Sequence, residues 1–139
     1  MLALAAVGYK RGVPFRGLLD RLVRSTRGAR GAIFCDYEGE AVALCIAVPP
    51  PPGCAPMADY DVKICGAQMA APMLALFDEE RAATLGRLVE LRMLCAHGTL
   101  ACHALPEGYY LVLLLAAGGH TFDAGWRLRE AAAMVAAEM

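Results

Sequence analysis

The sequence predicts an α/β domain of the α+β type, in which a single five-stranded antiparallel sheet carries helices on both faces. Two observations lead to this fold class. Apolar residues recur at helical spacing in three long stretches, and five shorter apolar stretches are separated by turn-forming residues. The last of these five, residues 109–116, is apolar on both faces, which is typical of a central strand covered from both sides.

The elements are expected in the order α-β-β-α-β-β-β-α. The expected helices cover residues 14–26, 59–81 and 121–139. The expected strands cover residues 31–37, 41–48, 86–96, 99–105 and 109–116. Residues 1–13 are interpreted as an N-terminal extension, and the domain itself is expected over residues 14–139.

Individual residues set the expected ends and breaks of these elements. Pro14 suits a first helical turn, where its missing N–H costs nothing. Asp59 is the expected N-cap of the second helix, and Pro72 should kink that helix because its ring clashes with the preceding turn. The prolines at 49–52 should end the second strand, since proline cannot donate to a ladder. They are interpreted as a rigid loop, with docking of an SH3-like partner as the alternative.

The composition indicates an ordered domain and excludes several classes of partner. At 139 residues the chain can bury about 70% of the surface that its unfolded form exposes. Hydrophobic residues make up 58% and the net charge is −1, so we expect no nucleic-acid partner. The apolar runs at 1–7 and 109–117 are too short to span a bilayer, and a cytoplasmic protein is expected.

Basic residues are concentrated near the N-terminus. Seven of them lie from Lys10 to Arg30, and Asp20 is the one acid in that stretch. The first helix therefore presents a basic face. We interpret this face as solvated, with contact to an acidic protein or lipid as the alternative.

The acidic residues of the first hairpin are the first candidates for a chemical site. Asp36, Glu38 and Glu40 offer three carboxylates for calcium binding or acid–base work. A tight turn at Glu38-Gly39 separates them, however, and the stretch lacks the oxygen-rich spacing of a calcium loop. We interpret it as a plain turn whose polar tip lies in water.

Other candidate sites have equally ordinary interpretations. His97, His103 and His120 lack the paired spacing of a zinc site. The Gly118-Gly119 loop lacks the lysine and glycine pattern of a phosphate-binding loop. No catalytic, metal-binding or cofactor-binding residue is therefore predicted.

Six cysteines are present, and none forms a CxxC pair. They are interpreted as reduced, buried thiols, because a secreted scaffold would place them in loops. A small thiol-dependent enzyme stays open as the less favoured hypothesis. The cysteines lie at positions 35, 45, 54, 65, 95 and 102.

Four features together resemble the Roadblock family of dynein light-chain-like proteins. A leading amphipathic helix ends in GARGAIFCD at 28–36, and an acidic-Gly turn follows at 38–39. A long Ala-rich helix follows the second strand, and YYLVLLLAAGGHTFDAGWRLREAA at 109–132 resembles the family's last strand, turn and closing helix. The similarity covers residues 14–139, although longin and profilin-like domains share part of the pattern.

The second helix is the most informative element for function. One face should pack on the sheet, but the opposite face is also small or apolar at its centre, which is typical of a helix that another helix approaches. The resemblance implies a dimer formed through this helix and the third strand. The predicted interface residues are Ala67, Ala70, Ala71, Leu74, Leu88, Glu90 and Arg92. Predicted contacts to a further partner are Lys63, Asp78, Arg81, Arg16, Arg24 and Arg27.

The resemblance implies a non-enzymatic, homodimeric interaction platform that binds a small Ras-like GTPase and regulates or positions it. Bacterial Roadblock proteins of this size are commonly paired with such GTPases in polarity and motility systems. The alternative is a structural adaptor that assembles with other Roadblock-like proteins or a motor complex, whatever nucleotide is bound.

Overall fold

The computed structural model describes residues 12–76, 84–118 and 121–139. The extension expected over residues 1–13 therefore lies almost wholly outside the described residues. The helices are α2 (Gly12–Ser25), α3 (Asp59–Gln68), α4 (Ala70–Leu76) and α5 (Thr121–Glu138), with a short 3-10 turn η1 (Pro106–Gly108). The strands are β1 (Ala29–Cys35), β2 (Ala41–Ile46), β3 (Glu90–Cys95), β4 (Gly98–Ala104) and β5 (Tyr110–Ala116).

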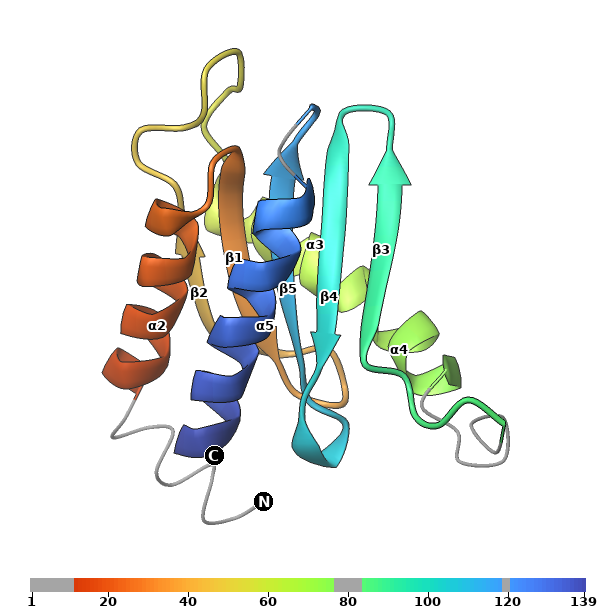
Figure 1. Cartoon of the computed structure of the whole chain (residues 1–139). Helices are drawn as coiled ribbons and strands as arrows, with labels where there is room; N and C mark the ends of the chain where they lie inside the picture. The colour runs from red at the N-terminus through yellow and green to blue at the C-terminus, as the bar shows by residue number, and fades with distance from the viewer. Residues whose placement is uncertain (1–11, 77–83, 119–120) are drawn as a thin grey trace.

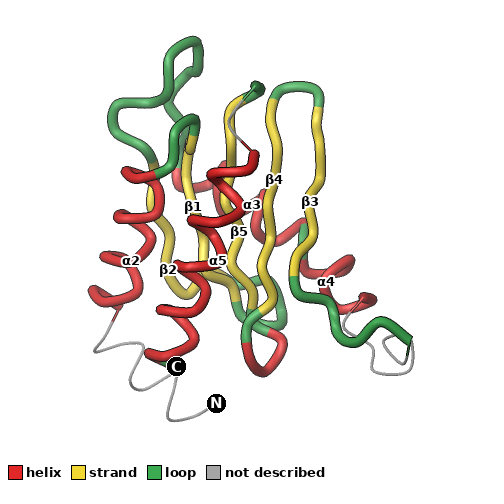
Figure 2. Tube along the Cα trace, in the orientation of Figure 1, coloured by secondary structure: helices red, strands yellow, loops and turns green. Residues whose placement is uncertain are grey.

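The five strands form one antiparallel sheet in the order β2-β1-β5-β4-β3, and a single antiparallel sheet is what the sequence predicted. Helices α2 and α5 cover one face, and α3 and α4 lie behind the other (Figure 1). The same three layers can be followed in the trace of Figure 2. Among the described residues the outermost strands of the sheet are β2 on one side and β3 on the other.

Strand β5 lies at the centre of the sheet and divides the core into two layers. Leu111, Leu113 and Leu115 pack under α2 and α5, whereas alternate residues such as Val112 and Leu114 pack under α3 and α4. All five of these side chains are buried. The prediction of a central strand covered on both faces is confirmed.

The first hairpin closes with a turn made by Asp36. Its carboxylate accepts the backbone N–H groups of Glu38 (2.9 Å) and Glu40 (3.0 Å), and Gly39 has a φ of 87°. The turn interpretation is therefore confirmed, but the expectation that the whole tip lies in water was wrong for Gly39. This residue is buried, and a Cβ placed on it would lie 2.9 Å from Cβ of Ala70.

The second helix has a different N-cap from the predicted one and is interrupted near Pro72. Ala58, not Asp59, is the N-cap, and the carboxylate of Asp61 accepts its backbone N–H at 3.0 Å. Helix α3 ends at Gln68 and α4 begins at Ala70, so the helix is interrupted just before Pro72, as the kink expected there implied. Proline has no N–H for the carbonyl four residues earlier, which belongs to Gln68. The part expected from residue 77 onward lies outside the described residues.

Several expected strand ends also shift. Strand β1 stops at Cys35 because Asp36 already turns the chain, and β2 stops at Ile46. Strand β3 begins at Glu90 and not at Gly86, whose φ of 87° is not that of an extended residue.

The cysteines differ in burial more than the sequence suggested. All six are free, and Cys35, Cys45 and Cys102 are buried. Burial raises the pKa of Cys35 and of Cys102 to about 12. Cys95 lies at the end of the edge strand β3 and is exposed, so the buried interpretation was wrong there, and Cys54 and Cys65 are only partly buried.

These differences predict an order of thiol labelling. In the native protein, iodoacetamide should modify Cys95 first and should leave Cys35 and Cys102 unmodified until the chain unfolds. Peptide mapping by mass spectrometry after timed labelling measures this order. Early modification of Cys102 would contradict its place in the core beneath α3 and α4.

Candidate interaction surface

Helix α3 is held very close to the sheet. A Cβ at Gly66 would lie 2.9 Å from Sγ of Cys35 and 3.0 Å from Cγ2 of Ile33, so only glycine permits this approach. The buried hydroxyl of Tyr110 donates a hydrogen bond to the Gly66 carbonyl at 2.7 Å. Val62 and other inward side chains then fill the core beneath the helix. The orientation of α3 is therefore fixed, and so is the face that it turns away from the sheet.

The outward face of α3 and α4 is apolar and uncovered. Tyr60 is 71% exposed and Leu74 is 66% exposed, and Ile64, Ala67 and Ala71 lie between them, at least partly exposed. Their spacing places these five residues along one side of the helix pair. A helix that is apolar on both sides normally has a partner on its second side.

Strand β3 adds an open sheet edge next to this face. Leu88 and Leu91 belong to the same core cluster as Ala70 and Met73 of α4, so β3 and α4 border the same core layer. The N–H of Ala104 donates to the Val89 carbonyl at 2.8 Å. In an antiparallel ladder, the backbone groups of successive residues point alternately to one side of the strand and to the other. Since Val89 points to β4, every second residue after it does so too, and the residues in between direct their N–H and C=O groups to the open edge. These residues are Glu90, Arg92 and Leu94.

Side chains of β3 alternate between the two layers. Val89 and Met93 are exposed on the α4 side, whereas Leu94 is 81% exposed on the α5 side. Exposed apolar residues thus flank the open edge on both sides. Such a contiguous apolar surface is typical of a protein–protein interaction site.

Two predicted interface residues of β3 already have partners within the chain. The Glu90 carboxylate pairs with Arg129 of α5 at 2.6 Å, and this pairing raises the pKa of the Arg129 guanidinium. The guanidinium of Arg92 lies against Gly125 of α5. Both side chains therefore lie on the α5 side of the sheet, and only their backbone groups face the edge.

The predicted interface residues consequently fall into separate groups. Ala67, Ala71 and Leu74 lie together on the outward face of α3 and α4. Ala70 is half-buried against Gly39, and Leu88 packs into the core. The side chains of Glu90 and Arg92 lie on the opposite side of the sheet. Only the backbone of β3 at the sheet edge could therefore belong to the same interface as the helical residues.

The predicted partner contacts are also divided. Lys63 is exposed on α3, whereas Arg16, Arg24 and Arg27 are exposed on and just after α2, on the other face of the sheet. Asp78 and Arg81 lie outside the described residues. No single surface of the described chain brings these residues together.

Four exposed apolar residues of this surface were missed from the sequence. Tyr60 and Ile64 precede Ala67 and Ala71 at helical spacing, so extending the same stripe toward the N-terminus of the helix would have found them. Val89 and Met93 gave no such signal, because the strand face that carries them was expected to be covered. The missed residues are Tyr60, Ile64, Val89 and Met93.

The described residues offer little for catalysis. They contain no group of three or more histidine, cysteine or acidic residues that could hold a metal ion. The raised pKa values of Cys35 and Cys102 are the opposite of the lowered value that makes a thiol nucleophilic. Nδ1 of His103 lies 2.8 Å from the Ala104 carbonyl. Within the described chain, no helix has the length and apolarity needed to cross a membrane.

A five-stranded antiparallel sheet between two helical layers, with an exposed apolar helix face beside an edge strand, defines a class of small α+β domain. Solved structures place the fold within that class. An MglB with a tetrameric arrangement superposes with a TM-score of 0.75 at 21% identity, covering 94% of this chain and 89% of that one. The gliding protein MglB of Thermus thermophilus gives 0.72 at 20% identity, covering 94% and 90%. A Roadblock/LC7 domain from Streptomyces avermitilis gives 0.64 at 13% identity, covering 86% and 92%.

The chain therefore has the Roadblock/LC7 fold, as the resemblance implied. At these identities the likeness establishes the fold alone. The sequence itself matches no protein-family model and none of the curated protein sequences.

Proposed function

We propose that this protein acts as a homodimer that binds a small Ras-like GTPase and regulates or positions it, without catalysis of its own. The observation that carries the proposal is the uncovered apolar face of α3 and α4 beside the open edge of β3. Two copies related by a two-fold axis would bury this face and pair their β3 edges into one continuous sheet. The tetrameric arrangement of the similar MglB supports self-association as a property of this fold.

The charges around this surface support a partner-selecting role. Burial of the central apolar residues would supply most of the binding energy, whereas exposed charges at the rim choose between partners. Lys63 is such a rim charge beside the apolar stripe of α3. In this proposal the GTPase contacts the surface formed by the paired helices, and its switch segments are ordered by that contact.

The second candidate is a structural adaptor that joins other Roadblock-like proteins. The same apolar face favours it, since a heterodimer would bury that face equally well. The two candidates differ in their response to nucleotide, because only a GTPase regulator senses the switch segments.

The proposal predicts nucleotide-dependent binding. A small Ras-like GTPase from the same organism, titrated calorimetrically against this protein, should bind at least about tenfold more tightly with a non-hydrolysable GTP analogue than with GDP. Equal affinity for both loaded forms would favour the adaptor. If the protein is a stable dimer but binds neither form of the GTPase, the GTPase proposal is contradicted, whereas the proposed dimer is not.

A further inference from the structure

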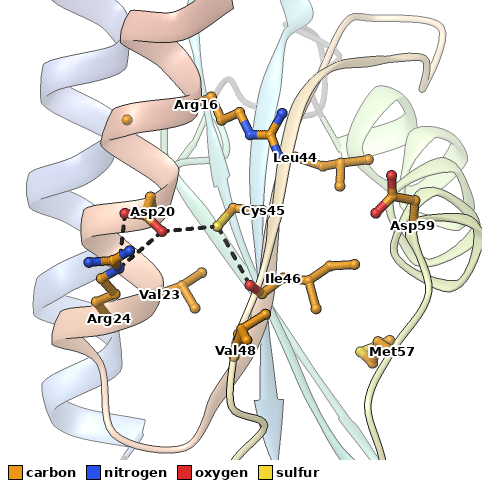
Figure 3. Close-up of a pocket in the computed structure, with 12 residues that line it drawn as sticks. Arg16, Asp20, Val23, Arg24, Leu44, Cys45, Ile46, Val48, Met57 and Asp59 are labelled. Atoms are coloured by element: carbon orange, nitrogen blue, oxygen red, sulfur yellow. Dashed lines mark hydrogen bonds and ion pairs between the residues drawn. The ribbon is translucent and has the colours of Figure 1, made fainter.

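A second surface lies at the other edge of the sheet, beside β2. A hollow of about 650 Å³ runs between α2, strand β2 and the chain leading into α3. Figure 3 shows β2 between Asp20 and Arg24 on one side and Met57 and Asp59 on the other. The edge of β2 therefore forms the floor of a groove with a wall on each side, which we call the β2 groove.

The floor of the β2 groove offers unpaired backbone groups. The N–H of Ala47 donates to the Arg30 carbonyl at 2.9 Å, so Ala47 faces β1. By the alternation of an antiparallel ladder, Cys45 also faces β1, and the N–H and C=O groups of Leu44 and Ile46 point into the groove. Within the described residues, β2 has no neighbouring strand on this side. The Ile46 carbonyl also accepts a long hydrogen bond from the Cys45 thiol, at 3.8 Å. The two N–H groups and the Leu44 carbonyl remain for pairing with an extended chain, and the weak thiol contact leaves the Ile46 carbonyl a second lone pair.

The α2 wall of the groove carries basic side chains. Arg24 is held by Asp20, with an N–O distance of 3.0 Å. Arg16 lies over β2 and makes no hydrogen bond or ion pair within the described part of the chain (Figure 3). Asp20 balances Arg24, and Asp59 lies on the opposite wall, so Arg16 is the position at which the groove would accept a carboxylate of a ligand.

A buried hydroxyl lies where the groove continues past the end of β2. A second hollow of about 390 Å³ is lined by Thr26, Val48 and the prolines at 49–52, and it shares Arg24 and Ala47 with the first. Thr26 is only 4% exposed, and its Oγ1 has no hydrogen-bond partner among the described residues. A buried polar atom without a partner is costly, but this hydroxyl has almost no accessible surface, so the ligand contacts proposed below do not include it.

We propose that the β2 groove binds an extended acidic peptide segment of a partner protein, which adds a sixth strand to the sheet. The peptide backbone pairs with Leu44 and Ile46, and one of its carboxylates pairs with Arg16. This mode of recognition uses main-chain hydrogen bonds for affinity and side-chain pockets for specificity. The site is independent of the proposed dimer, which uses the opposite edge at β3.

A peptide fits these observations better than a lipid surface or a nucleic acid. Only an extended backbone satisfies alternating donors and acceptors along a strand edge. The overall charge of −1 gives no general attraction to polyanions, so the basic residues act locally.

The test begins with selection from a display library of random linear peptides on the wild-type protein. Enriched peptides are synthesised, and their affinities are measured for two pairs of variants. Leu44→Pro removes a backbone N–H that does not take part in the pairing of β2 with β1. Leu44→Ala is its control, because it removes the leucine side chain as the proline does but keeps the N–H. Arg16→Glu and Arg21→Glu make the same charge change inside and outside the groove.

The expected result is enrichment of acidic peptides whose affinity falls about tenfold with Leu44→Pro and with Arg16→Glu but changes little with the two controls. In the wild type, bound peptide should slow hydrogen exchange at the amides of Leu44 and Ile46, which does not depend on any variant folding. Failure to enrich acidic peptides, equal binding by Leu44→Pro and Leu44→Ala, or unchanged exchange at both amides would each overturn the proposal. Arg16-dependent binding to phosphatidylserine vesicles in place of peptides would overturn it too.

Discussion

The double substitution Ala71→Glu/Leu74→Glu is expected to reduce the molar mass in solution from near twice the chain mass to the single-chain value of 14.8 kDa. Both side chains lie on the uncovered face of α3 and α4, so the monomer loses little when they change. In a dimer each added carboxylate would be buried without a partner, which costs several kcal/mol per charge. Light scattering coupled to size exclusion measures the mass.

The matched control is Ala133→Glu/Ala137→Glu, which places two carboxylates on exposed positions of α5 and should leave the dimer intact. Ala70 is unsuitable for this test, although the sequence placed it in the interface, because it is partly buried against the core and a glutamate there could destabilise the monomer. A double variant at positions 71 and 74 that keeps the wild-type dimer mass would move the interface away from this face.

Gly39→Ala is expected to lower the free energy of unfolding by about 3 kcal/mol. The φ of 87° is unfavourable for alanine, and the new Cβ would lie 2.9 Å from that of Ala70. The hairpin turn and α4 would have to separate to make room. Chemical denaturation monitored by circular dichroism measures the loss.

Gly53→Ala is the matched control, because Gly53 has a φ of 80° but no atom within 4 Å of an added Cβ. It should cost only about 1 kcal/mol, which reflects the backbone conformation alone. Equal losses in the two variants would mean that the contact between the hairpin and α4 contributes nothing to stability.

The order of the elements could be predicted from the sequence because each rests on a local signal. The all-apolar run of β5 required cover on both faces, and Gly39 with the acidic residues around it required a turn. The break before Pro72 also follows from local chemistry, since it reflects one missing N–H.

The interaction surface could be predicted only in part. Helical spacing correctly placed Ala67, Ala71 and Leu74 on a face away from the sheet. Which strands lie at the edges depends on long-range pairing, so the exposure of Val89 and Met93 could not be read from a local pattern. The same holds for the β2 groove, which exists because distant segments border one edge strand.

Side-chain partners across elements were equally invisible in the sequence. The sequence placed Glu90 and Arg92 in the interface. In the structure, Glu90 forms an ion pair with Arg129 of α5, and Arg92 lies against Gly125 of the same helix. Their contribution to an interface is therefore expected to come from backbone groups at the edge of β3, not from their charges.

The central claim, a dimer that presents one surface to a GTPase, is tested most directly by the stoichiometry of the complex. Native mass spectrometry is performed on this protein mixed with a small Ras-like GTPase loaded with a non-hydrolysable GTP analogue. The account predicts a complex that contains two copies of this 14.8 kDa chain, and its loss in Ala71→Glu/Leu74→Glu. A complex with a single copy, formed equally well by the double variant, would contradict it.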